Sequence, residues 1–324
     1  MSVAAVLGLA SCGQTGRVVG LPLLWQAVVW VAGSILLWHA APLVTHAAYF
    51  ERFVETAALS DGVWCLLIGT WGLWAARQVP LVWLRRLRWA GGIMIAANLV
   101  AWLGGRPNGL LGIDRLLGAY ALLWLPILAT WKWWLVPLPL ALLVVSGKPT
   151  MWIALAAMAT CWQPRRWWWT VPLALAIALV IAEWHVLALG HPSTFSRLLQ
   201  RWETWAPTFQ ATFAHPFVGW GFSPMAFSSM QQTYHARLPS IHSDWLSVAF
   251  HAGWIVCAVA GWAWWTIIRT VARTRWQRAI QASLCGIGVL AFGHSVVSHA
   301  RIAGIVLLLL AWWWAESEQP KECG

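Results

Sequence analysis

Charged side chains are too few in this sequence to cover a water-soluble fold. Only 10% of the 324 residues are Asp, Glu, Lys or Arg, whereas 60% are hydrophobic, and a typical soluble domain is about 25% charged. The mean hydropathy is +0.65. The composition therefore excludes a soluble globular protein, a disordered chain and a coiled coil. It indicates an all-α, polytopic integral membrane protein.

The apolar runs predict about ten membrane-spanning helices, because a helix needs roughly 20 mostly apolar residues to cross a bilayer. The predicted spans are 21–39, 57–76, 89–104, 117–131, 133–147, 150–162, 167–187, 244–268, 279–297 and 301–315. No internal repeat and no low-complexity linker divides the sequence, so we expect a single membrane domain over residues 1–324.

The basic residues set the expected orientation. The net charge is +11, but the arginines and lysines are dispersed between apolar runs, which favours orientation in a bilayer over nucleic-acid binding. The short arginine-rich loops 77–88, 163–166 and 269–278 face the cytoplasm under the positive-inside rule. Both termini are then cytoplasmic, and the long polar segment 188–243 forms a loop on the outer, periplasmic face.

We expect the chemistry in this outer loop, since loops carry function more often than the scaffold does. Its middle predicts an amphipathic helix over 196–213 that lies along the membrane surface, because apolar residues recur there every three or four positions. These residues are Leu198, Trp202, Trp205, Phe209 and Phe213.

Arg197 and Arg201 lie four residues apart and share one face of that helix. Their guanidinium groups are either solvated at the lipid headgroups or form a clamp for an anion, since a guanidinium fork suits phosphate. The turn that follows contains Pro216, Gly219 and Gly221, which let the backbone approach another group closely.

His242 stands at the water edge of the predicted span 244–268. It is either a plain interfacial residue or a general base, because imidazole has an unperturbed pKa of about 6.5. Asp244 either orients His242 or caps the following helix, and Ser243 is the alternative cap.

These segments together resemble the O-antigen ligase and O-antigen polymerase superfamily. The resemblance is carried by Arg201-x-x-x-Trp205, then by His215-Pro216-x-x-Gly219-x-Gly221, and then by His242-x-x-x-Leu246 with Gly253. In that family an Arg-x-x-x-Trp helix precedes a Pro-x-x-Gly-x-Gly turn, and a His-Asn-x-aromatic-Leu segment then enters a helix that ends in Gly. The order and the spacing both match here.

Shorter segments extend the resemblance to roughly residues 105–315. A counterpart of the family's Asn-Pro-Asn stretch lies at Asp114-Arg115, which replace the usual Asn. Lys148 falls where the family often has an arginine at a helix mouth. His294 resembles a late His-Ser element, although the acidic residue that commonly follows is absent.

The resemblance implies a GT-C-like glycosyltransferase of the bacterial inner membrane, with its active site on the periplasmic face. Members of this family move a glycan from an undecaprenyl-diphosphate carrier to a hydroxyl of a glycolipid or glycan acceptor, as in lipopolysaccharide O-antigen ligation or polysaccharide polymerisation. They use no metal and no nucleotide sugar, so we expect no cofactor. The expected partners are this donor, the acceptor and membrane lipids.

The expected roles follow from this resemblance and from the chemistry of the side chains. His242 is the expected general base, and Arg201 is the first cation for the leaving diphosphate. The expected substrate-binding residues are Lys148, Arg115, Arg197, Pro216, Gly219, Gly221, His294 and Arg301.

Three alternatives remain at this point. A protein O-oligosaccharyltransferase has the same motif set. A lipid-linked glycan transporter or flippase would place ionisable residues near the membrane midplane, whereas here the charge gathers at one face. An intramembrane protease would use Ser223 in a Gly-x-Ser turn, but this serine lies in the polar loop and Pro224 follows it.

Overall fold

The computed structural model describes residues 81–106, 114–146, 148–162, 180–181, 183–184, 194–221, 224–235, 241–296 and 300–317. Within these ranges every regular element is a helix and no strand occurs. The all-α fold class is therefore confirmed for this part of the chain. The predicted spans 21–39 and 57–76, and most of 167–187, lie outside the described residues.

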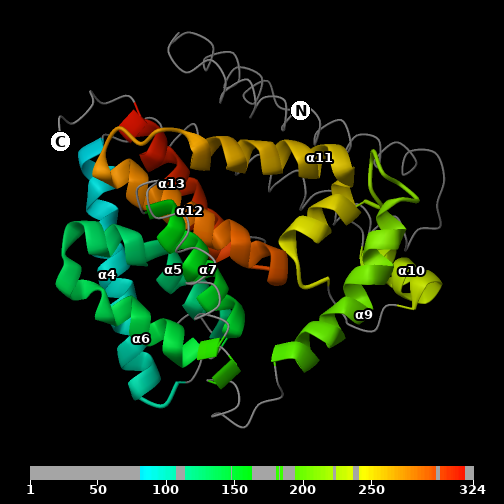
Figure 1. Ribbon diagram of the computed structural model, residues 1–324, viewed down its shortest axis with the longest axis horizontal. Coiled ribbons are helices and arrows are strands. Elements are labelled where there is room, and N and C mark those ends of the chain that lie inside the picture. Colours follow the sequence, from blue (N-terminus) through cyan, green and yellow to red (C-terminus); the bar gives the residue numbers. More distant parts are fainter. Residues whose placement is uncertain are drawn as a thin grey trace, which may run out of the picture. The chain divides into compact units, whose positions relative to one another are not determined.

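The chain divides into two compact units. The described part of unit 1 runs from Leu199 to Thr266, and unit 2 contains the described residues before and after it. Unit 1 holds most of α9 (Thr194–Thr212), all of α10 (Pro224–Tyr234) and most of α11 (Asp244–Arg269). The polar segment expected as an outer loop thus contains two helices, α9 and α10 (Figure 1).

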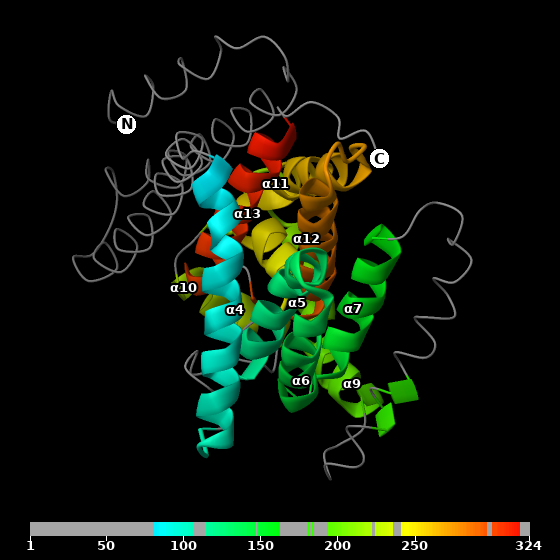
Figure 2. The same ribbon diagram turned by 90° about the vertical axis from the view of Figure 1, so that its left-hand side faces the viewer.

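Unit 2 is a helical bundle. Its elements are α4 (Leu81–Leu103), α5 (Asp114–Trp131), the 3₁₀ turn η2 (Trp133–Leu135), α6 (Pro137–Ser146), α7 (Pro149–Trp162), α12 (Arg275–Gly293) and α13 (Ala300–Ser317). α12 packs against α5, α7 and α13, and α4 packs against α5, α6 and α13 (Figure 2). Nearly every residue of α12 from Trp276 to Ala291 is buried, so this helix forms the core of the unit.

Glycines let the helices of unit 2 approach one another closely. A Cβ atom on Gly91 of α4 would lie 2.3 Å from the Trp124 indole of α5. A Cβ atom on Gly118 of α5 would lie 2.8 Å from the Met151 side chain of α7. Such close contacts hold helices together where the surroundings are as apolar as the helix faces.

Two of the polar side chains that α12 buries, Gln281 and Ser283, are bonded to backbone carbonyl groups. Ser283 donates to the carbonyl oxygen of Leu123 at 2.7 Å, which ties α12 to α5. Gln281 donates to the carbonyl oxygens of Ile267 and Thr270, at 2.8 and 2.7 Å. An unpaired buried polar group costs about 1–3 kcal/mol, so these bonds make the polar residues of a buried helix tolerable.

Among the described helices, α11 alone is long and apolar enough to cross a membrane. Four shorter apolar helices, at 116–131, 133–146, 150–162 and 302–317, coincide with predicted spans. The count of about ten spans therefore stays a prediction.

Two helices begin earlier than the sequence predicts. α4 starts at Leu81 and α12 starts at Arg275, inside the segments 77–88 and 269–278 that were expected as loops. Some of the arginines in these two segments therefore lie on helices and not in loops. A hydropathy pattern misses such starts, because arginine is a good helix former yet interrupts an apolar run.

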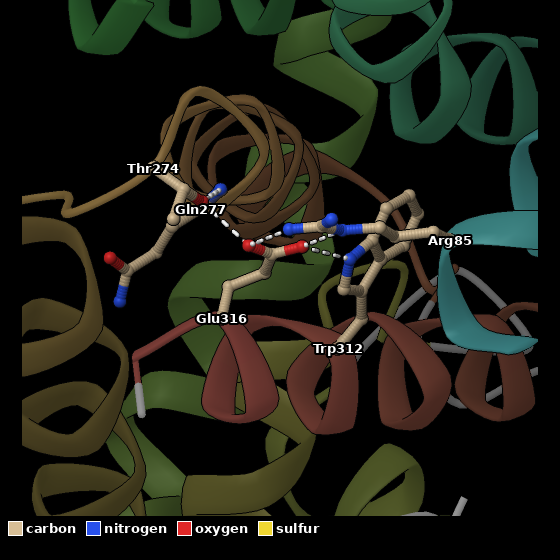
Figure 3. Close-up of polar contacts among 5 residues, drawn as sticks. All are labelled: Arg85, Thr274, Gln277, Trp312 and Glu316. Atoms are coloured by element: carbon tan, nitrogen blue, oxygen red, sulfur yellow. Dashed lines mark hydrogen bonds and ion pairs between the residues drawn. The ribbon is translucent and has the colours of Figure 1, made fainter. Parts of the chain in front are cut away.

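A buried carboxylate joins three helices of unit 2 (Figure 3). Glu316 of α13 is fully buried, and it accepts hydrogen bonds from Nε and Nη2 of Arg85 in α4, at 2.8 and 3.1 Å. It also accepts from the Trp312 indole at 3.0 Å and from the hydroxyl of Thr274, the N-cap of α12, at 2.8 Å. Both carboxylate oxygens are thus paired twice, which offsets the cost of burying the charge.

We expect Glu316→Gln to lower the free energy of unfolding by about 2–3 kcal/mol. This is less than the ~3–5 kcal/mol for one partner of a fully buried ion pair, because the Arg85 side chain stays 35% exposed. Thermal unfolding in detergent measures the change. Glu203→Gln, at an exposed carboxylate of α9, is the control and is expected to stay within about 0.5 kcal/mol of the parent. Equal destabilisation of the two variants would contradict the role given to Glu316.

Candidate functional site

The Arg-x-x-x-Trp segment of α9 holds the backbone that carries His242. The indole Nε1 of Trp205 donates to the carbonyl oxygen of Ile241 at 2.8 Å, across 36 residues of chain. Ile241 directly precedes His242, and Arg201 lies one turn before Trp205 on the same face of α9. Two motif segments that are far apart in the sequence therefore meet in unit 1.

His242 has a backbone conformation that few residues adopt. Its φ is +53°, in the left-handed region where a residue other than glycine costs about 1–3 kcal/mol. The next residue starts the helix, because the Ser243 side chain accepts the Leu246 N–H at 3.2 Å. Of the two caps that the sequence left open, Ser243 is therefore the one that caps α11. The His242 side chain is partly exposed at the helix start.

α9 is a helix, as predicted, and several aromatic side chains along it are largely exposed, although Trp205 is not. Trp202, Phe209 and the adjoining Phe213 are 63%, 47% and 60% exposed. The buried face consists of small and hydroxyl-bearing residues, namely Thr204, Thr208, Ala211 and Thr212. The Thr208 and Thr212 hydroxyls donate to carbonyl groups of their own helix, at 2.7 and 2.6 Å. An exposed aromatic face of this kind is typical of a helix at a membrane surface.

α11 is broken at Gly253, where φ is +86° and ψ is 167° and the helix changes direction (Figure 1). The break removes helical hydrogen bonds on both sides, and the turn 215–221 replaces them. The replacement bonds run from Trp220 N–H to the Phe250 oxygen, from Gly221 N–H to the His251 oxygen and from Trp254 N–H to the Pro216 oxygen, at 2.7, 3.1 and 2.7 Å.

Glycine is required on both sides of this contact. A Cβ atom on Gly253 would lie 2.4 Å from the carbonyl oxygen of Phe217, and one on Gly219 would lie 2.5 Å from the backbone of His251. Both glycines also have positive φ, at +86° and +69°. The close backbone approach that the sequence predicted for this turn is thus an approach to α11.

Side chains fasten the same turn to α9 and α11. Trp220 stacks on Phe250 with ring centroids 5.8 Å apart and donates its indole N–H to the Ala211 carbonyl oxygen at 2.7 Å. Nδ1 of His251 lies 2.6 Å from the Gly221 carbonyl oxygen. A carbonyl oxygen only accepts, so Nδ1 carries a proton and the orientation of this imidazole is fixed.

A second cluster of polar residues lies in unit 2. Thr150, two residues after Lys148, contacts His294. Oγ1 of Thr150 lies 2.6 Å from Nε2 of His294, across 144 residues of chain. Lys148 directly precedes the first residue of α7, and its carbonyl oxygen accepts the Met151 N–H at 3.0 Å. A lysine, a hydroxyl group and a buried imidazole thus gather at the N-terminal end of α7, where the helix dipole is positive.

The predicted site residues fall into two groups. Arg201, His242, Pro216, Gly219 and Gly221 belong to unit 1, and Lys148 and His294 belong to unit 2. Arg115, Arg197 and Arg301 lie on α5, α9 and α13, and their side chains lie outside the described residues. The substrate-binding roles of all these residues stay predictions.

Sequence reasoning missed Thr150 and His251. Neither residue belongs to a recognisable motif, and each is defined by a contact with a distant segment. The available signal was position alone: Thr150 stands two residues after Lys148, and His251 stands two residues before Gly253 in the third motif segment.

Comparison of the chain with protein-family models, curated proteins and solved structures finds no match. Within the described residues, no three His, Cys, Asp or Glu side chains are grouped so as to hold a metal ion. The function must therefore be argued from the residues of the two groups.

We expect Gly253→Ala to prevent stable folding of unit 1. The new methyl group would lie 2.4 Å from the carbonyl oxygen of Phe217, which is a backbone atom and not a flexible side chain. The positive φ at Gly253 adds strain for any residue with a Cβ atom. The expected loss is more than about 3 kcal/mol, measured as the amount of monodisperse protein and its melting temperature in detergent.

Gly261→Ala is the matched control on the same helix. The nearest atom to its new methyl group is a Trp245 ring carbon at 3.7 Å, an ordinary contact. Normal yield and melting temperature are expected for this variant. A Gly253→Ala protein as stable as the Gly261→Ala protein would show that the break in α11 is not required.

Proposed function

We propose that this chain is a polytopic membrane glycosyltransferase of the O-antigen ligase or polymerase type. It moves a glycan from an undecaprenyl-diphosphate carrier to a hydroxyl group of a glycolipid or glycan acceptor. The observation that supports this most is the bond from Trp205 to the Ile241 carbonyl group. This bond joins the segment that contains Arg201 to the segment that contains His242, the two residues to which we assign the chemistry.

The proposed reaction is a direct displacement at the anomeric carbon of the donor. The acceptor oxygen forms a bond to that carbon, the bond from the carbon to the phosphate oxygen breaks, and the electron pair leaves with the diphosphate. The acceptor proton passes to an imidazole nitrogen of His242, acting as general base. Arg201 stabilises the charge that develops on the leaving diphosphate, because a guanidinium fork pairs with two phosphate oxygens. A single displacement inverts the anomeric centre.

The polar group of unit 2 is consistent with a phosphate-bearing donor. Lys148, Thr150 and His294 gather at the N-terminal end of α7, an apolar helix. A cation and a positive helix end both favour an anion. We propose that Lys148 and His294 are substrate-binding residues, as the sequence predicted, and that Thr150 orients the His294 ring.

The membrane setting is part of the proposal. α11 is long enough to span, four shorter helices are apolar, and large apolar side chains such as Val100, Trp184 and Trp262 are exposed. We propose about ten spans in the bacterial inner membrane, cytoplasmic termini and a periplasmic active site that needs no cofactor.

The transporter alternative would use the broken helix in α11, since broken helices bind substrates in many transporters. There they offer unpaired backbone groups to the substrate. Here the carbonyl groups of Phe250 and His251 and the N–H of Trp254 are already bonded to the turn 215–221. The break therefore favours a structural role over transport. A protein acceptor, as in an O-oligosaccharyltransferase, uses the same chemistry and remains a variant of the proposal.

We expect Arg201→Ala and His242→Ala each to lower glycan transfer at least about 100-fold, because each removes a group that acts in the transition state. Transfer from a polyprenyl-diphosphate-linked glycan is measured in membranes, with and without EDTA, and the product ladder separates polymerase from ligase. EDTA is expected to have no effect.

His235→Ala is the matched control for these variants. His235 is also a histidine with positive φ, +56°, and it is exposed at the end of α10. Parent-level transfer is expected. If the Arg201 and His242 variants are expressed and retain full transfer, the proposed site is wrong, and translocation of the lipid-linked glycan becomes the activity to assay.

We expect Trp205→Phe to lower transfer about tenfold. The variant keeps an aromatic ring but loses the hydrogen bond to Ile241, so the His242 segment is no longer held in position. The melting temperature is expected to change by only a few degrees, since one hydrogen bond contributes about 1 kcal/mol. Trp202→Phe, at an exposed ring of the same helix, is expected to retain transfer. Equal activity of the two variants would contradict the positioning role.

A further inference from the structure

Three arginines gather where α4 and α12 begin, beside the Glu316 network. Arg85 forms an ion pair with Glu316. Arg88 lies one turn further along α4, and Arg275 is the first residue of α12. Burial, and after it the positive charges of Arg85 and Arg275, lower the pKa of Arg88. Among the described residues of this group, three guanidinium groups accompany one carboxylate, so positive charge is in excess there.

Arg88 and Arg275 are held by aromatic rings. The guanidinium carbon of Arg88 lies 5.2 Å from the ring centroid of Trp131 and 5.2 Å from that of Trp276. The guanidinium carbon of Arg275 lies 5.4 Å from the Trp276 ring. An aromatic face stabilises a cation, but it does not accept the in-plane N–H groups of a guanidinium.

One of these donors is buried and unsatisfied. Nε of Arg88 is buried, and no group of the described chain accepts a hydrogen bond from it. Among the described residues, the buried indole N–H groups of Trp152 and Trp313 also lack an acceptor, but they carry no charge. An unpaired donor on a charged group is more costly, so Arg88 is the position where a missing acceptor matters most.

The amide of Gln277 is not part of this group. Its Oε1 accepts the Arg273 N–H at 2.6 Å, and no group within the described ranges accepts from its Nε2. Figure 3 shows that this amide points away from Arg85 and Glu316. The excess charge and the unpaired charged donor thus centre on Arg88 and Arg275, which we call the arginine site.

We propose that the arginine site binds the phosphate of an anionic phospholipid headgroup. A phosphate group would accept from the terminal Nη groups of Arg88 and from the exposed guanidinium group of Arg275. Its negative charge would compensate the two guanidinium groups that Glu316 does not pair. Basic groups between membrane helices near the cytoplasmic surface are suited to anionic headgroups. This inference does not depend on the proposed glycan transfer.

The surface of α4 favours a lipid over free phosphate. Beyond Arg88 the helix exposes Trp89, Ile93 and Val100, spaced by one or two turns. This stripe offers acyl chains an apolar surface that begins next to the arginine site. Inorganic phosphate has the same headgroup chemistry without the chains, so the two ligands can be separated by experiment.

The test follows thermal unfolding of the full chain, purified in a neutral detergent, as phosphatidylglycerol is added. A ligand that binds only the folded state raises the melting temperature with its concentration. Phosphatidylcholine with the same chains and sodium phosphate are added in parallel. We expect a saturable rise with phosphatidylglycerol and much smaller shifts with the other two.

The decisive comparison uses two double variants of equal charge. Arg88→Gln with Arg275→Gln removes the arginine site and is expected to weaken phosphatidylglycerol binding at least about tenfold. Arg86→Gln with Arg278→Gln removes two exposed arginines of the same helices and is expected to bind like the parent. Native mass spectrometry of the retained lipid provides a second readout.

Equal weakening in both double variants would overturn the proposal, because binding would then follow total charge. Equal shifts with phosphatidylcholine would also overturn it. Sodium phosphate acting as strongly as phosphatidylglycerol would overturn the lipid assignment. If the arginine-site variant does not fold, Arg88→Lys replaces it: a lysine keeps the charge but lacks Nε and the fork. Unchanged phosphatidylglycerol binding by Arg88→Lys would likewise contradict the site.

Discussion

The break in α11 and the turn that docks into it determine the geometry of unit 1. Backbone groups freed within an apolar protein have no water to bond with, so another part of the chain must pair them. The turn 215–221 does this, and Gly219 and Gly253 are needed for it to come close enough. The same contact ties down α9, because Trp220 donates to Ala211 and Trp254 donates to Thr212.

His242 depends on this arrangement. With α9 held against α11, Trp205 reaches the Ile241 carbonyl group, and His242 has its left-handed backbone conformation directly before Ser243 caps the helix. The strained backbone of His242 is therefore supported on both sides. Strain that the surroundings maintain is frequent at functional sites, which agrees with the role proposed for this residue.

In unit 2 the buried polar groups that find partners are side chains. Glu316 is saturated by Arg85, Trp312 and Thr274, and His294 is paired with Thr150. Because apolar helices make each unpaired polar group costly, the exceptions are informative. Arg88 is a charged residue whose buried Nε has no acceptor among the described residues, and it belongs to the proposed lipid site.

The bounds of α5, α7 and α11 agree with the predicted spans to within a few residues, because the length of an apolar run is a local property. The helix that carries Arg201 and Trp205 followed from its spacing for the same reason. The spacing could not tell which face of α9 is buried, and the structure buries threonines there and exposes Trp202. Nor could it show that Gly253 breaks α11, since a glycine within an apolar run is compatible with a continuous helix.

The sequence by itself determined the all-α class, the positions of most described helices and the residue types available for chemistry. These depend on composition and on contacts between near neighbours. The tertiary structure alone decided which polar groups meet: Arg85 with Glu316 across 231 residues, Thr150 with His294 across 144, and Trp205 with Ile241 across 36. A hydrogen bond needs its two atoms within about 3 Å of each other, and only the path of the folded chain brings such distant residues to that distance.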